Sequence, residues 1–286
     1  MAGYADRIWR SSDGLNLYAR DYAGAPGEAR LPVICIHGLT RNSKDFEDVA
    51  PAIAAAGRRV LVLDVRGRGR SDRDSVAANY HPGTYAADVI ALMDALGLAR
   101  AVFVGTSMGG LITMALSSFA PARVAAGLLN DVGPELDPAG IARIASYVGK
   151  PATIATWEDA AAYARATNGA AFPDQPDSFW AAFARRTLAQ GPDGRPMLDY
   201  DPAIASAVAP GPMPDLWPLF TAFAADRPIA LVRGALSDLI TAGIAARMKQ
   251  AAPHLDVTEV ANVGHAPMLT EPAAADAIAR FLAAAP

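Results

Sequence analysis

Residues 102–110 read Val-Phe-Val-Gly-Thr-Ser-Met-Gly-Gly, a short apolar run that leads into the pattern Gly-x-Ser-x-Gly. The apolar run predicts a strand, and the residues from Met108 onward predict a helix. A strand-to-helix turn of this kind lifts the hydroxyl of its central residue, Ser107, clear of the backbone, so that it can act as a nucleophile. Glycines at 105 and 109 are expected because a side chain at either position would collide with the neighbouring strand or helix. The same pattern can also mark a tight structural turn.

A serine nucleophile needs a base to take its proton, and the base needs a third group to hold its tautomer. His265 lies in Gly-His-Ala-Pro directly after the last predicted strand, so it projects from the same carboxyl edge of the sheet as Ser107. We therefore expect His265 to be the general base. His37, which ends another strand, is expected to brace its loop, and His81 and His254 to be solvated loop residues.

Two aspartates are candidates for the third group of this site. Asp131 follows the predicted strand 124–130, and Asp238 follows the predicted strand 228–232 in Arg-Gly-Ala-Leu-Ser-Asp. Either aspartate satisfies the chain order Ser, Asp, His. Because both lie at the carboxyl edge of the sheet, the residues alone do not separate them. We favour Asp238 and keep Asp131 as the alternative acid.

An oxyanion hole for this chemistry needs two backbone amides near the serine. Met108, the residue after the nucleophile, is expected to supply one. The other is expected from the loop after the strand 31–36, which reads His-Gly-Leu-Thr at 37–40, through the amide of Leu39.

Composition excludes several other classes of function. The chain has 286 residues, of which 52% are hydrophobic and 19% are charged, as in a globular enzyme and unlike a disordered chain. A net charge of −4 is too small to indicate a nucleic acid or an anionic membrane surface as partner. The sequence has neither a nucleotide-binding glycine motif nor a metal-ligand spacing, so we expect no cofactor and no metal. It also has no signal-peptide pattern and no run of ~18 apolar residues, which predicts a cytoplasmic location without membrane insertion.

The order of apolar and amphipathic segments predicts an α/β fold. Strands that are apolar throughout alternate with helices up to residue 130 and again from residue 228, as in a parallel sheet covered on both faces. Between them, residues 134–218 have a helical and interrupted pattern with five bulky aromatic side chains, those of Tyr147, Trp157, Phe172, Trp180 and Trp217. We expect 134–218 to be an inserted helical cap on a core made of 1–133 and 219–286.

Taken together, these segments resemble the α/β-hydrolase family. The similar stretches are His-Gly at 37–38, Asp-x-Arg-Gly-x-Gly-x-Ser at 64–71, Gly-x-Ser-x-Gly at 105–109, Arg-Gly at 233–234 through Asp238, and Gly-His at 264–265. The resemblance implies a mostly parallel eight-stranded sheet with helices on both faces, a triad on its carboxyl edge and the cap inserted after the sixth strand. Most members place the acid after the seventh strand, which supports Asp238; a minority place it after the sixth, where Asp131 lies.

These expectations combine into a serine hydrolase that cleaves a small to medium carboxylic ester or lactone through an acyl-enzyme. The aromatic residues of the cap suggest a substrate with an apolar portion. The alternative on the same triad is a carbon–carbon bond hydrolase of the meta-cleavage type, and a more distant alternative is a non-catalytic ligand receptor. A serine at the elbow argues against haloalkane dehalogenases and epoxide hydrolases, which use aspartate there. The sequence does not predict an oligomeric state.

Overall fold

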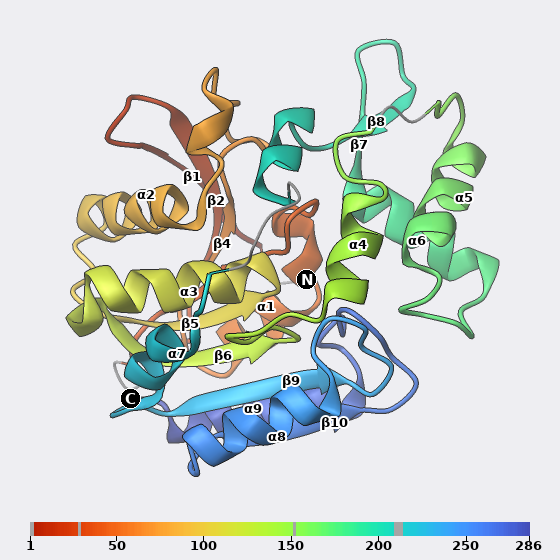
Figure 1. The fold of residues 1–286 in the computed structure, drawn as a ribbon. Helices are drawn as coiled ribbons and strands as arrows, with labels where there is room; N and C mark the ends of the chain where they lie inside the picture. Colours follow the sequence, from red (N-terminus) through yellow and green to blue (C-terminus); the bar gives the residue numbers. More distant parts are fainter. Residues whose placement is uncertain (1–2, 28–29, 151–152, 209–213) are drawn as a thin grey trace.

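A computed structural model describes residues 3–27, 30–150, 153–208 and 214–286 (Figure 1). Its main element is an eight-stranded sheet in the order β1-β2-β4-β3-β5-β6-β9-β10. β2 pairs antiparallel with both neighbours and all other pairs are parallel, which confirms the mostly parallel sheet. The strands are β1 (Ala5–Arg10), β2 (Asn16–Tyr22), β3 (Val33–Ile36), β4 (Val60–Asp64), β5 (Ala101–Thr106), β6 (Val124–Asn130), β9 (Ile229–Gly234) and β10 (Asp256–Val260).

Helices cover both faces of this sheet. Every residue of β3, β4, β6 and β9 is buried, because apolar side chains on both faces meet a helical layer. One face packs against α2 (Pro82–Ala95), α3 (Met108–Phe119), α7 (Trp217–Ala224) and α8 (Ala242–Ala251), and the other against α1 (Val49–Ala55) and α9 (Pro272–Ala284). The observed α/β fold therefore agrees with the sequence prediction, β6 has the predicted bounds, and α3 begins at Met108 as predicted.

The turn after β4 has a structural role. The carboxylate of Asp64 accepts hydrogen bonds from the backbone amides of Ser43 (2.6 Å) and Arg70 (2.8 Å) and so joins two loops. Arg66 is buried, and its guanidinium contacts three carboxylates, those of Asp13, Asp74 and Asp88. These contacts connect the loops beside the carboxyl edge of the sheet.

The segment between β6 and β9 lies over one end of the sheet (Figure 1). It contains α4 (Pro138–Ala145), α5 (Trp157–Asn168), α6 (Asp177–Thr187), a hairpin of β7 (Leu188–Gln190) and β8 (Pro196–Leu198), and the 3-10 helix η4 (Pro202–Val208). The hairpin is one of the interruptions in this otherwise helical segment. The division into core and cap stays a prediction, since α7 straddles its boundary at 218 and packs against α3. Residues 151–152 and 209–213 of the expected cap, and 1–2 and 28–29 of the expected core, lie outside the described residues.

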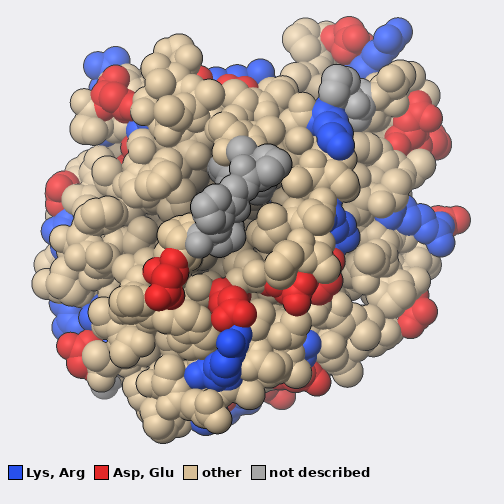
Figure 2. Space-filling model, viewed as in Figure 1, with Lys and Arg blue, Asp and Glu red and all other residues tan. Residues whose placement is uncertain are grey.

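The surface is mixed in charge. On the face drawn in Figure 2, acidic and basic side chains are interspersed among the described residues, and neither sign covers a continuous area. No helix in the described ranges is both long and apolar enough to cross a membrane.

Candidate active site

The turn between β5 and α3 has the geometry of a nucleophile elbow. Ser107 has a φ of +51° and a ψ of −115°, a backbone conformation that is costly for a residue with a side chain. A Cβ on Gly105 would lie 2.4 Å from the carbonyl carbon of Gly109, and one on Gly109 would lie 2.1 Å from the carbonyl oxygen of Ile36. Both glycines are therefore required, for the steric reason expected from the sequence.

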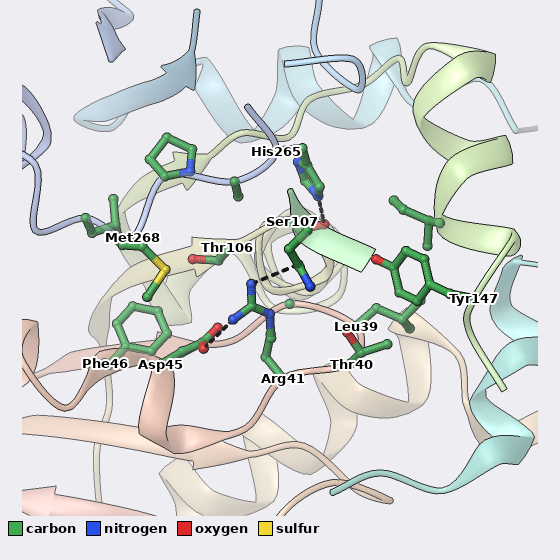
Figure 3. Close-up of a pocket in the computed structure, with 16 residues that line it drawn as sticks. Leu39, Thr40, Arg41, Asp45, Phe46, Thr106, Ser107, Tyr147, His265 and Met268 are labelled. Atoms are coloured by element: carbon green, nitrogen blue, oxygen red, sulfur yellow. Dashed lines mark hydrogen bonds and ion pairs between the residues drawn. The ribbon is translucent and has the colours of Figure 1, made fainter. Parts of the chain in front are cut away.

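Three side chains form a continuous hydrogen-bonded chain at this edge of the sheet. The Ser107 hydroxyl lies 2.9 Å from Nε2 of His265 (Figure 3), and Nδ1 of His265 lies 2.7 Å from Oδ2 of Asp131. The second contact favours the tautomer in which Nδ1–H donates to the carboxylate, which leaves Nε2 free to accept the serine proton. The structure thus brings the predicted nucleophile and the predicted base together.

Asp131 is a fully buried carboxylate with a complete set of partners. It directly follows β6 with a φ of +54° and has 0% of its surface exposed. Oδ1 accepts from the backbone amide of Gly234 (2.9 Å), and Oδ2 accepts from the Ser237 hydroxyl (2.6 Å) as well as from His265. These donors compensate for the lost hydration of the carboxylate, so a negative charge is tolerated beside the imidazole.

Asp238 does not contact His265, which corrects the preference stated from the sequence. Its carboxylate instead forms a two-pronged ion pair with Arg143 of α4, with Nε–Oδ2 at 2.5 Å and Nη2–Oδ1 at 2.8 Å. This hydrogen-bonded guanidinium holds the pKa of Asp238 below its usual range. After β9 the loop directs Ser237, the preceding residue, towards the buried carboxylate of Asp131. The carboxylate that contacts His265 therefore comes from the end of β6.

The two residues whose amides were predicted to form an oxyanion hole, Leu39 and Met108, both lie near Ser107. Leu39 borders the same cavity as Ser107, and Met108 is the first residue of α3, where amides have no acceptor within the helix. Within the described ranges, neither amide donates a hydrogen bond to another backbone group outside the helices and strands. The N-terminal end of α3 also favours negative charge near Ser107.

The loop that carries Leu39 is held from two sides. Nε2 of His37 accepts from the amide of Val65 (3.0 Å), and its Nδ1 lies 2.7 Å from the carbonyl oxygen of Gly38. Burial lowers the pKa of His37 to about 3, so the ring is neutral. Arg68 donates to the carbonyl oxygen of Leu39 (2.9 Å). His37 therefore braces the loop, as the sequence suggested.

The cavity beside Ser107 is small and largely polar. Its volume is about 50 Å³, and its lining includes Leu39, Thr40, Arg41, Asp45, Phe46, Thr106, Tyr147, Asn168 and Met268 (Figure 3). Of the five aromatic residues singled out in the sequence, only Tyr147 lines it. Phe172 and Trp180 instead pack against each other and against α6 side chains. Ile144, Pro267 and Leu269 also line the cavity, so a substrate with an apolar portion stays a prediction. In the described ranges, no group of three or more His, Cys, Asp or Glu is arranged to hold a metal ion.

Sequence reasoning missed two contributors to this site. Ser237 supports the buried carboxylate, and Arg41 places a guanidinium on the cavity wall. Arg41 lies only two residues after Leu39, so its proximity to the oxyanion loop was a signal that could have identified it. The role of Ser237 depends on the path of the loop after β9 and has no comparable sequence pattern.

Comparisons with known proteins agree with this fold. Residues 32–272 match the model of a family described as alpha/beta hydrolase fold. The chain is 38% identical over 274 residues to a 3-hydroxybutyrate-oligomer hydrolase of Cupriavidus necator, covering 92% of each protein. It is 37% identical over 125 residues to a non-heme chloroperoxidase of Streptomyces lividans, covering 43% of this chain and 44% of that one. A crystal structure of an alpha/beta hydrolase from Novosphingobium aromaticivorans aligns with a TM-score of 0.92 and 44% identity over 99% of each chain. The chain belongs to the α/β-hydrolase family and is a hydrolase.

Proposed function

We propose that this hydrolase cleaves a small carboxylic ester, with Ser107 as nucleophile, His265 as general base and acid, and Asp131 as the group that orients His265. The observation that carries the proposal is the chain of hydrogen bonds from Ser107 through His265 to Asp131. An arrangement of this kind supports attack on an acyl carbon, because the base takes the serine proton as the new C–O bond forms.

The reaction then follows from the positions of the groups. His265 Nε2 accepts the proton of Ser107 as Oγ adds to the ester carbonyl, and the carbonyl oxygen becomes an oxyanion. The amides of Leu39 and Met108 are proposed to stabilise this oxyanion; one such donor typically contributes ~3 kcal/mol to lowering the barrier. His265 returns the proton to the departing alcohol, and water, activated by the same ring, hydrolyses the acyl-enzyme.

The substrate class rests on two observations of different kinds. The relative from Cupriavidus necator is named for oligomers of 3-hydroxybutyrate, whose units are joined by ester bonds. The cavity at Ser107, about 50 Å³ in volume, has polar groups in its lining. Both favour a short ester with polar substituents over a long-chain lipid ester, and a lactone of similar size fits the same chemistry.

The proposal is tested with a set of p-nitrophenyl esters of increasing acyl length, short lactones and a 3-hydroxybutyrate dimer. We expect turnover to be highest for the short and the hydroxylated esters. An active-site-directed phosphonate should modify one residue, and peptide mapping should locate the adduct on Ser107. Ser107→Ala should remove both turnover and labelling, whereas Ser75→Ala, at an exposed position, serves as the matched control. Turnover of vinylogous diketones without turnover of esters would instead support the carbon–carbon bond hydrolase alternative.

A further inference from the structure

We infer that Arg41 is a specificity residue that binds a carboxylate of the substrate, so that the preferred esters carry a free carboxylate near the scissile bond. The inference rests on the proposed ester hydrolysis and names the substrate class of that site. It is carried by an incompletely paired guanidinium on the wall of the cavity that contains Ser107.

Arg41 is close to the reaction centre. A Cβ placed on Gly38 would lie 3.7 Å from both Cγ of Arg41 and Cβ of Ser107, so the side chains of Arg41 and Ser107 start from neighbouring positions. In the close-up, the guanidinium of Arg41 lies beside Asp45 (Figure 3), and Arg41 and Ser107 line the same cavity. A substrate group bound to Arg41 would therefore share this cavity with the carbon that Ser107 attacks.

The guanidinium of Arg41 has unused donors, although it is largely buried. Its side chain is 14% exposed, and it stacks over the ring of Phe183 at 4.3 Å. Nη1 donates to Asp45 at 3.1 Å, and Nη2 reaches Asn168 only at 3.5 Å. Within the described ranges, its Nε donates no hydrogen bond to a side chain.

Other arginines of this molecule are paired differently. Arg143 binds Asp238 through two nitrogens, and Arg59 binds Asp21 in the same way at 2.8 and 2.9 Å. A guanidinium presents a planar fork that matches the two oxygens of a carboxylate. Asp45 accepts a hydrogen bond from Nη1 of Arg41. The other donors of this guanidinium are therefore available to a ligand in the cavity.

A second cavity borders the first and has a more apolar lining. Its volume is about 30 Å³, and it shares Thr40, Arg41, Tyr147 and Asn168 with the cavity at Ser107. The space beside Arg41 therefore extends beyond the cavity at Ser107.

The test compares two matched esters, p-nitrophenyl hemisuccinate, which carries a carboxylate, and its neutral methyl ester. We expect the wild-type protein to prefer the anionic ester, and Arg41→Gln to reduce the ratio of the two kcat/KM values about tenfold or more. Arg165→Gln removes the same charge from an exposed ion pair with Asp177 and should leave the ratio unchanged. Asp45→Asn removes the carboxylate that accepts from Nη1 of Arg41. This variant should maintain or increase the ratio of the two kcat/KM values.

Direct binding separates this inference from the proposed function. Ser107→Ala protein should bind glutarate, measured by calorimetry, and the added change Arg41→Gln should weaken binding about tenfold or more. Arg41→Gln/Asp45→Asn removes the whole ion pair and should give the same loss if the single variant is unstable. If the wild-type protein hydrolyses neither ester but glutarate binds through Arg41, the proposed function fails and the carboxylate subsite stands. Equal ratios, or equal glutarate binding, with and without Arg41 would overturn the inference.

Discussion

Asp131 and Asp238 follow neighbouring strands of one sheet at the same edge, yet they differ in environment and partners. Asp131 is fully buried and accepts hydrogen bonds from Gly234, Ser237 and His265. The side chain of Asp238 is 34% exposed and is paired with Arg143 of α4. A carboxylate at this edge of the sheet is therefore not sufficient to orient the imidazole; the loop must also direct it inward and satisfy its remaining oxygen lone pairs.

This difference assigns the two carboxylates to separate tasks. In the proposed mechanism, the buried carboxylate of Asp131 stabilises the imidazolium that forms when His265 takes the serine proton. The pair of Asp238 with Arg143 connects the loop after β9 to α4 of the segment between β6 and β9. We therefore expect changes near Asp131 to reduce the reaction rate and changes near Asp238 to alter stability.

The largest loss of activity is expected at His265, whose imidazole contacts Asp131 and not Asp238. His265→Ala removes the base, and kcat should fall by a factor of ~10⁴ or more, since triad members act as a unit. His254→Ala, at an exposed position, provides the control for loss of a histidine. The measurement is kcat on the best ester, with circular dichroism to verify folding. A fall of less than tenfold would remove His265 from the proposed mechanism.

A smaller loss of activity is expected when the Ser237 hydroxyl, which donates to Asp131, is removed. Ser237→Ala removes the donor to Oδ2 of Asp131 and an acceptor for the amides of Leu239 and Ile240. An unsatisfied buried carboxylate lone pair costs ~1–3 kcal/mol, so kcat should fall roughly tenfold and the unfolding temperature should decrease. The same kinetic and thermal measurements on Ser75→Ala should show neither change. Unchanged kinetics in Ser237→Ala would show that the hydroxyl is not needed to hold the carboxylate.

The smallest effect is expected at the Arg143–Asp238 pair. Because the pair is partly exposed, Asp238→Asn should destabilise the protein by only ~0.5–1 kcal/mol at neutral pH. The pKa of Asp238 is lowered from 3.8 in the folded state, so its contribution to stability is present above pH 3.8 and is lost as the pH falls through the lowered value. Unfolding of wild-type and Asp238→Asn protein should therefore differ at pH 6 and converge at low pH. A constant difference down to pH 2 would contradict this ion-pair account.

Much of this architecture could be predicted from the sequence. Apolar strands and amphipathic helices have a strong hydrophobic period, which is why the bounds of β6 and the start of α3 were predicted correctly. Ser107 and His265 were identified because each directly follows a predicted strand. Their hydrogen bond in the structure agrees with that placement.

Other features depend on contacts between distant residues and left no local pattern. The choice between the two aspartates depends on Arg143, 95 positions before Asp238 in the chain, and on the direction of the loop after β9. The β7–β8 hairpin has strands of only three residues, too short for a periodic signal. The aromatic side chains of α6 pack against one another and do not line the cavity at Ser107, which composition alone does not reveal.

The most direct test of the account is a comparison of kcat/KM for Asp131→Asn and Asp238→Asn on the same ester. Asparagine keeps the size of the side chain but removes the charge and can impose the wrong imidazole tautomer. We predict that Asp131→Asn lowers kcat/KM by a factor of ~10³–10⁴, whereas Asp238→Asn lowers it less than tenfold. A large loss in Asp238→Asn with near-normal activity in Asp131→Asn would contradict the proposed triad.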